Sequence, residues 1–209
     1  MPEHRIFAAF YNAIFAGLEK AGLADKRREL LAGAEGDTLE LGAGTGHNLE
    51  HYPEAVDRLV LTEPDPHMAK RLRAQVEESG RAGVEVVEAG AESLPFGDGE
   101  FDTVIATLVF CTIPEPQAAL DEIARVLKPG GRMLFLEHVR GDSPTRARWQ
   151  DRMNPVQNLL FGGCNLNRPT ADTLRSSPLE IEELRPDEMP RTAGPLVKPM
   201  IVGSARAAR

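Results

Sequence analysis

The stretch Thr38–Asn48 reads TLELGAGTGHN and decides the fold. Its apolar start predicts a short strand, and the glycines at alternate positions, Gly42, Gly44 and Gly46, predict a tight turn that leads into a helix. Because glycine has no side chain, the backbone N–H groups of such a turn can approach a ligand closely. The next apolar run ends in Glu63, the place expected for a ribose-binding carboxylate at the end of a second strand.

The order of residues in the turn indicates which ligand it suits. A dinucleotide-binding turn follows the pattern G-x-G-x-x-G, and from Gly42 its third glycine would fall on His47. The carboxylate of Glu40 precedes the first glycine by two residues. This charge would repel a pyrophosphate but attract an ammonium or a sulfonium group. The turn therefore favours a cationic ligand that carries a nucleoside.

The turn resembles the first motif of the class I S-adenosylmethionine-dependent methyltransferases, E/D-x-G-x-G-x-G. The resemblance implies an enzyme that uses S-adenosylmethionine as its methyl donor. It also implies that Glu40 and the backbone of Gly42, Gly44 and Gly46 lie beside the methionine part of the cofactor. The two oxygens of Glu63 would then accept hydrogen bonds from the ribose hydroxyls. A glycine turn in some other α/β protein is the alternative interpretation.

A second segment is expected to contact the adenine ring. Glu88–Phe96 resembles the family stretch G-D-A-x-x-L-P-F, but Gly90 stands where the family has the aspartate that meets the adenine amino group. Either Glu92 or the backbone around Gly90 and Ala91 takes that role in this interpretation. The other cofactor contacts that the resemblance implies are Pro64, Met68, Thr107 and Leu108.

Apolar runs alternate with helical patterns along most of the chain. Strands are predicted at 37–42, 58–63, 84–88, 101–107, 131–138, 178–185 and 197–206. Helices are predicted at 47–54, 66–79 and 115–127. The alternation predicts an α/β, Rossmann-like fold with a mostly parallel seven-stranded sheet and helices on both faces, and the resemblance implies an antiparallel last strand. A single domain over 1–209, with an N-terminal helical cap over 1–31 and a catalytic core over 37–209, is the simplest organisation.

Charge and cysteine content narrow the possible partners. The net charge of -8 argues against a nucleic-acid partner, because phosphate neutralisation needs clustered Lys and Arg. The basic groups in Lys26–Arg28 and Arg140–Arg152 are interpreted as solvated faces. The spacing of Cys111 and Cys164 predicts neither a disulfide framework nor a metal site. A reducing, cytoplasmic setting is therefore expected.

The N-terminal stretch Ile6–Leu18 has apolar residues at helical spacing and lacks the order of a signal peptide. A helix that packs on the main domain is the favoured interpretation. The alternatives are a lid over the active site, with Tyr11 as a substrate contact, and a helix that makes weak contact with a membrane surface. No stretch of the sequence is long and apolar enough to predict a transmembrane helix.

A closer resemblance, to the small thiol S-methyltransferases of animals, rests on Ala106–Ile113, Leu136–Val139 and Gly162–Arg168. It implies a small-molecule acceptor, and specifically a thiol. A phospholipid headgroup amine and a quinone-type or phenolic ring stay open as acceptors, as does a non-catalytic protein that binds S-adenosylmethionine. The substrate contacts expected from this resemblance are Cys111, Asn165 and Arg168.

Two ionisable residues end the strand predicted at 131–138. Imidazole titrates near neutrality, so His138 is a candidate base or substrate contact, and Glu137 is a second candidate at the same strand end. A hydrogen-bonded structural role is the alternative for both residues. A thiol acceptor already carries some thiolate at neutral pH and needs little help from a base, whereas an oxygen or carbon nucleophile needs one. Cys164 is interpreted as a small packed hydrophobe rather than a reactive thiol.

Overall fold

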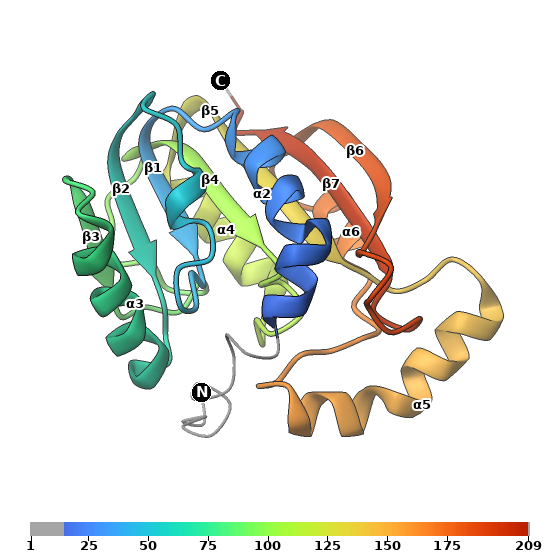
Figure 1. Ribbon diagram of the computed structural model, residues 1–209. Coiled ribbons are helices and arrows are strands. Elements are labelled where there is room, and N and C mark those ends of the chain that lie inside the picture. Colours follow the sequence, from blue (N-terminus) through green and yellow to red (C-terminus); the bar gives the residue numbers. More distant parts are fainter. Residues whose placement is uncertain (1–14, 209) are drawn as a thin grey trace.

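The computed structural model describes residues 15–208, whose strands form one seven-stranded sheet in the order β3-β2-β1-β4-β5-β7-β6 (Figure 1). The strands are β1 (Gly36–Leu41), β2 (Val56–Thr62), β3 (Val84–Val87), β4 (Phe101–Thr107), β5 (Leu127–His138), β6 (Glu180–Glu188) and β7 (Pro199–Arg206). Strands β1 to β5 pair in parallel, and β7 runs antiparallel to both β5 and β6. The predicted fold class, including the antiparallel last strand, is confirmed.

Helices cover both faces of the sheet because successive side chains of a strand point to opposite sides. They are α2 (Ala24–Leu31), α3 (Pro66–Ser79), α4 (Pro116–Val126) and α6 (Thr170–Arg175). On one face Val104 and Ala106 belong to the same buried cluster as Leu120 of α4. On the other, Ile105 clusters with Leu72 of α3. The near-continuous apolar run of β4 is thus explained by burial on both sides.

The N-terminal cap is described only in part. The chain is helical from Phe15 through Leu31, and this stretch includes the π-helical turn η1 (Glu19–Leu23). Leu23 and Leu31 are fully buried, so the described part of the cap packs on the domain. Tyr11 and most of the stretch Ile6–Leu18 lie outside the described residues.

Two helical segments differ from the prediction. Over 47–54 the structure has only the 3-10 turn η2 (Leu49–His51), because Pro53 follows and disfavours helical geometry at Tyr52, which is extended. The helix α5 (Pro144–Leu160) was not predicted. It begins with Ser143 as its N-cap, whose side chain accepts a hydrogen bond from the Arg146 N–H.

Within residues 15–208, none of the helices combines the length and the apolar character that crossing a bilayer requires.

Candidate active site

The glycine bend follows β1 directly, at the carboxyl edge of the sheet. Gly42, Gly44 and Gly46 all have positive φ, at 58°, 62° and 92°, a conformation that residues with a Cβ rarely adopt. Space is a second requirement, since a Cβ on Gly42 would collide with the side chain of Val109. The bend therefore needs glycine for its conformation and for its close approach to the chain that follows β4.

Glu63 follows β2 and holds the bend from the side. It is 7% exposed, and its Oε2 and Oε1 accept hydrogen bonds from the N–H groups of Gly44 and Asp65, both at 2.9 Å. Burial raises the pKa of Glu63 to about 7. Each carboxylate oxygen retains a further lone pair, so Glu63 can support the bend and still accept the hydroxyls of a ribose.

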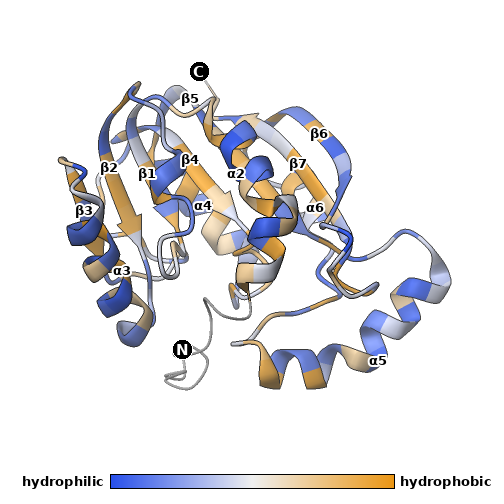
Figure 2. Ribbon diagram, in the orientation of Figure 1, coloured by the Kyte–Doolittle hydropathy of each residue, from blue (hydrophilic) through white to orange (hydrophobic). Residues whose placement is uncertain are grey.

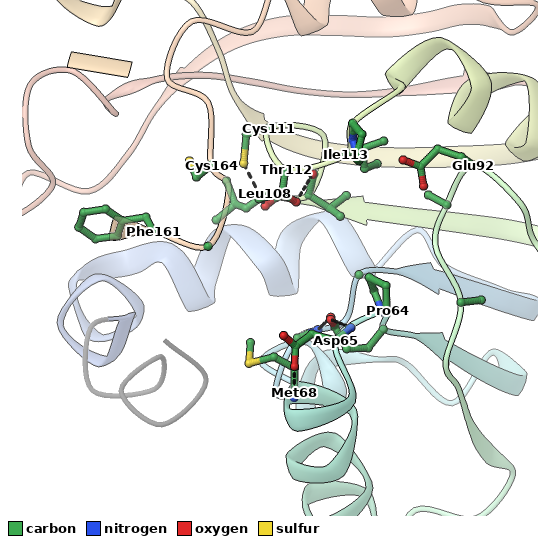
Figure 3. A pocket seen from close by; sticks show the side chains of 18 of the residues that line it. Pro64, Asp65, Met68, Glu92, Leu108, Cys111, Thr112, Ile113, Phe161 and Cys164 are labelled. Carbon is green, nitrogen blue, oxygen red and sulfur yellow. Dashed lines mark hydrogen bonds between the residues drawn. The ribbon is translucent and has the colours of Figure 1, made fainter. Parts of the chain in front are cut away.

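A cavity opens between the bend, the start of α3 and the loop after α5 (Figure 3). In Figure 3, Glu92 and Phe161 lie at opposite ends, and Met68 lies across from Leu108. The predicted residues that line it are Gly42, Gly44, Glu63, Pro64, Met68, Ala91, Glu92, Leu108 and Cys111. The lining also contains residues that were not predicted to bind ligand, among them Phe15, Asp65, Gln157, Phe161 and Cys164.

Some predicted cofactor residues lie outside the cavity lining: Gly46 within the bend, and Glu40 and Thr107 behind it. Glu40 is 2% exposed, and its carboxylate accepts hydrogen bonds from the Tyr52 hydroxyl at 2.6 Å and from Asn48 Nδ2 at 2.8 Å. Asn48 Nδ2 also donates to Thr107 Oγ1 at 2.9 Å. Glu40 and Thr107 therefore support the base of the bend through Asn48.

Arg27 completes this network from the cap. The interpretation of Lys26–Arg28 as a solvated face is wrong for Arg27, which is 3% exposed. Its Nη1 donates to Asn48 Oδ1 and to Thr107 Oγ1, both at 3.0 Å. The pKa of Glu40 is raised overall by burial, and the hydrogen bond from Tyr52 and then the guanidinium of Arg27 partly oppose this rise. The cap thus supplies a cation close to the buried carboxylate beneath the bend.

Glu137 and His138, predicted as catalytic, lie at the end of β5 and outside the cavity lining. Glu137 is fully buried, and its carboxylate accepts the N–H groups of Val109 at 3.0 Å and Phe110 at 3.2 Å. It thus braces the turn after β4, where Leu108 has a positive φ of 56°. Burial raises the pKa of Glu137 to about 7. This geometry supports a positioning role for Glu137.

The two cysteines come together at the end of the cavity on the side of Phe161 (Figure 3). His138 Nε2 lies 3.2 Å from Cys164 Sγ, and both Cys111 and Cys164 line the cavity. The hydrogen bond with Cys111, and to a lesser extent the one with His138, lowers the pKa of Cys164. The pKa of Cys111 is raised by the same hydrogen bond and by burial. Cys164 is half-buried, borders the cavity and contacts His138, a more polar setting than the packed hydrophobe predicted from the sequence.

Asn165 and Arg168, predicted as substrate contacts, tie the loop after α5 to the turn after β4. The backbone N–H and the side-chain Nδ2 of Asn165 both donate to the Cys111 carbonyl at 2.9 Å. Arg168 Nη2 donates to the Ile113 carbonyl at 2.7 Å. Neither residue lines the cavity. They hold Cys164 beside Cys111, and so support this end of the cavity without lining it.

Comparison with known proteins agrees with this arrangement. Residues 39–135 match a family described as a methyltransferase domain. The chain is 36% identical over 207 residues to the human thiol S-methyltransferase TMT1A, covering 94% of this chain and 84% of that protein. It is 32% identical over 216 residues to human thiol S-methyltransferase TMT1B, and the match covers 98% of this chain and 87% of that protein. The fold matches that of the N-methyltransferase NodS from Bradyrhizobium japonicum in complex with S-adenosyl-L-homocysteine, with a TM-score of 0.65 and 17% sequence identity. The match covers 91% of this chain and 87% of NodS.

The fold, the glycine bend and the carboxylate after β2 define an S-adenosylmethionine-dependent methyltransferase of class I. The residues fit this cosubstrate, since a Cβ would block the bend at Gly42 and the lone pairs of Glu63 suit a diol. Within that class, the chain belongs to the family of the human thiol S-methyltransferases TMT1A and TMT1B.

Proposed function

We propose that this methyltransferase methylates the sulfur of a small thiol. The observation that carries the proposal is the chemistry of the end of the cavity that we assign to the acceptor. Its lining is mostly apolar or sulfur-bearing, with Thr112 and Gln157 as polar exceptions; the other residues are Leu108, Cys111, Ile113, Phe161 and Cys164. The candidate bases of β5 are turned to other partners, since Glu137 binds backbone N–H groups and His138 contacts Cys164. A site of this kind suits an acceptor that is nucleophilic without a strong base.

A thiol meets that requirement. With a pKa of ~8.5 it is a few per cent thiolate at neutral pH and is intrinsically a strong nucleophile. When bound, S-adenosylmethionine supplies a methyl group on a sulfonium sulfur, whose departure as a neutral thioether needs no proton. The contribution of the chain is then positioning: Glu63 and the glycine bend fix the nucleoside, and the turn braced by Glu137 presents Leu108 and Cys111 to the acceptor.

A labelled-methyl screen on the purified full-length chain tests the proposal, with small thiols, amines, phenols, quinols and phospholipids as acceptors. Label is expected in the thioether products of thiols, and the Glu63→Ala variant, with an impaired ribose site, is expected to lose it. Transfer to a lipid amine or a ring acceptor, with none to thiols, would replace the proposal by one of those activities. Binding of adenosylhomocysteine without transfer to any acceptor would indicate a non-catalytic protein.

We further propose that α5 makes contact with an anionic membrane surface, from which apolar thiols could reach the cavity. Figure 1 shows α5 extending away from the sheet, and Figure 2 shows apolar residues along it. The large exposed apolar side chains among residues 15–208 all lie in this helix: Trp149, Met153, Val156, Leu159 and Leu160. The helix also carries Arg146, Arg148 and Arg152 against the single acid Asp151. Apolar and basic residues together are typical of an interfacial helix.

Co-sedimentation with vesicles tests this contact in the full-length chain. Binding to vesicles that contain phosphatidylserine, and weaker binding to pure phosphatidylcholine vesicles, is the expected result. Leu159→Glu should reduce binding, while the exposed Thr145→Glu, which adds the same charge outside the apolar set, should reduce it less. Equal binding of both variants and the unaltered chain would contradict the proposal, as would a dimer in solution that buries Trp149.

The cytoplasmic setting expected from the cysteines stays a prediction.

A further inference from the structure

We propose that Cys111, His138 and Cys164 form a binding site for a soft divalent cation, with Zn²⁺ as the best match. One ligand atom from each residue lies within 4.8 Å of the other two. The three come from different elements, namely the turn after β4, the end of β5 and the loop after α5. No other group of three His, Cys, Asp or Glu residues with this closeness occurs in the part of the chain that the structure describes.

The distances are close to those that a tetrahedral zinc site needs. Zn–S bonds of about 2.3 Å and Zn–N bonds of about 2.0–2.1 Å place neighbouring ligand atoms roughly 3.5–3.8 Å apart. The His138 Nε2 to Cys164 Sγ distance is 3.2 Å, and the Cys111 Sγ lies within 4.8 Å of both. Small rotations of these side chains would therefore bring all three onto one cation.

The donor set and its charge match the same cation. Thiolate and imidazole ligands together favour zinc over magnesium or calcium, and two thiolates with a neutral imidazole cancel a double positive charge. Neutrality matters because Cys111 is 3% exposed and His138 is 4% exposed. Among residues 15–208 the buried Nδ1 of His138 has no hydrogen-bond partner. The ring is held in the structure through its Nε2 contact with Cys164, which coordination of both atoms by one cation would replace.

Neighbouring residues hold the ligands in place, as is usual around metal sites. Asn165 fastens its loop to the Cys111 carbonyl through two hydrogen bonds of 2.9 Å. Gln157 Nε2 lies 3.8 Å from Cys164 Sγ as a donor. The Cys111 thiol donates to the Leu108 carbonyl at 3.6 Å, a bond that is given up when the thiolate binds a cation. The loop that carries Cys164 is therefore held beside Cys111 by contacts that do not depend on the cation.

Three protein ligands leave the fourth tetrahedral position open, which is the arrangement of catalytic rather than structural zinc sites. Both cysteines line the cavity, so the open position faces the acceptor end. This step rests on the proposed thiol acceptor: its S–H bond breaks, the proton goes to solvent and the thiolate binds the cation. Its sulfur lone pair then forms the bond to the methyl carbon, while the electrons of the broken C–S⁺ bond stay on adenosylhomocysteine. The thioether product is a weaker ligand and leaves.

Metal titration of the reduced full-length protein tests the site without requiring activity. After treatment with a chelator, the protein is titrated with Zn²⁺ in competition with a chromophoric chelator, and with Co²⁺ as a spectroscopic probe. We expect one equivalent per chain and absorption bands from tetrahedral cobalt bound to thiolate. Cys164→Ser and His138→Gln should each weaken binding by about tenfold or more. The matched control His67→Gln changes a histidine of α3 outside the cluster and should leave binding unchanged.

Parallel measurements keep the outcomes distinct. Binding of adenosylhomocysteine to each variant shows that it is folded and tests the cosubstrate site separately. Intact binding of adenosylhomocysteine with no metal bound by the unaltered chain overturns the metal site and leaves the thiol acceptor standing. Loss of both free thiols under air, without metal binding, overturns it in favour of a Cys111–Cys164 disulfide. A cobalt spectrum that does not change when a small thiol is added overturns the open position.

Discussion

The Gly44 N–H donates a 2.9 Å hydrogen bond to Glu63 Oε2, so the residue that follows β2 holds the bend that follows β1. The other oxygen of Glu63 accepts the Asp65 N–H at the same distance. One buried carboxylate therefore joins the bend to the start of α3, where Asp65 is the N-cap. Cosubstrate binding and the conformation of the bend should consequently depend on the same side chain.

Affinity for adenosylhomocysteine should rise with pH. Burial raises the pKa of Glu63 from 4.5 to about 7, and only the ionised carboxylate accepts hydrogen bonds from both ribose hydroxyls. The Kd should therefore fall by up to about tenfold between pH ~6 and ~8. Glu63→Gln should bind more weakly and with a flat profile over this range. Calorimetry across the pH series measures the Kd of the unaltered chain and of the variant. If the Kd of the variant depends on pH as steeply as that of the unaltered chain, the titrating group is not Glu63.

The stability of the ligand-free protein should change in the opposite direction. Because the folded state holds the Glu63 proton more tightly than the unfolded state, it binds more protons between pH 4.5 and about 7. The stabilisation from this group is complete below pH 4.5 and is lost as the pH rises through about 7. Denaturant unfolding of the unaltered chain and of Glu63→Gln at several pH values isolates this contribution as the difference between the two curves. A difference that grew with pH would contradict it.

Gly42→Ala should abolish cosubstrate binding, whereas Gly80→Ala should not. Both glycines have similar positive φ values, 58° and 64°, so an alanine is strained at either position by about 1–2 kcal/mol. At Gly42 the new methyl group would also collide with Val109, while nothing lies within 4 Å at Gly80. Adenosylhomocysteine titrations of the two folded variants separate the two effects. Similar affinity in both would mean that backbone strain alone matters.

Glu137→Gln should destabilise the fold by about 1–3 kcal/mol, because an amide can accept only one of the two N–H groups that the carboxylate binds. For a chain of this size that corresponds to a Tm lower by roughly 2–4 °C per kcal/mol. The exposed Glu78 of α3 provides a control, and Glu78→Gln should leave the Tm nearly unchanged. Equal melting temperatures for the Glu137→Gln variant and the unaltered chain would contradict the proposal that Glu137 braces the turn after β4.

Asn165→Ala should raise the KM for the acceptor and leave the Kd for adenosylhomocysteine unchanged. The substitution removes the side-chain bond to the Cys111 carbonyl and so loosens the acceptor end, while Glu63 and the bend are untouched. Asn167→Ala, which removes an exposed bond to Asp151, serves as the comparison in the same loop. A change in Kd as large as the change in KM would show that the loop supports the whole cavity.

Local sequence patterns predicted the strands whose residues are buried in the core. The strands around Leu39, Val60 and Val104 are buried on both faces and read as apolar runs, and the glycine bend with Glu63 follows from spacing along two consecutive strands. The helix α5 was missed because it packs little of its apolar surface against a core: its apolar residues, such as Leu159, are exposed to solvent.

Contacts between distant segments were beyond prediction. Arg27 looked like one member of a basic run, and only the packing of α2 on the sheet shows that it lies beside Asn48. Cys111 lies in the turn after β4 and Cys164 in the loop after α5, and the two segments meet through Asn165. Their spacing in the sequence therefore does not follow any metal-site pattern. Glu137 was predicted as catalytic from its place at a strand end, but the direction of its carboxylate depends on the turn after β4, which the local sequence does not show.

Calorimetric titration of the full-length chain with adenosylhomocysteine tests the central claim most directly. One binding site per chain, with affinity lost in Glu63→Ala and kept in the exposed control Glu78→Ala, is the result that a cavity built on the bend and Glu63 predicts. Absence of binding to the folded chain, or equal affinity in Glu63→Ala, would contradict it.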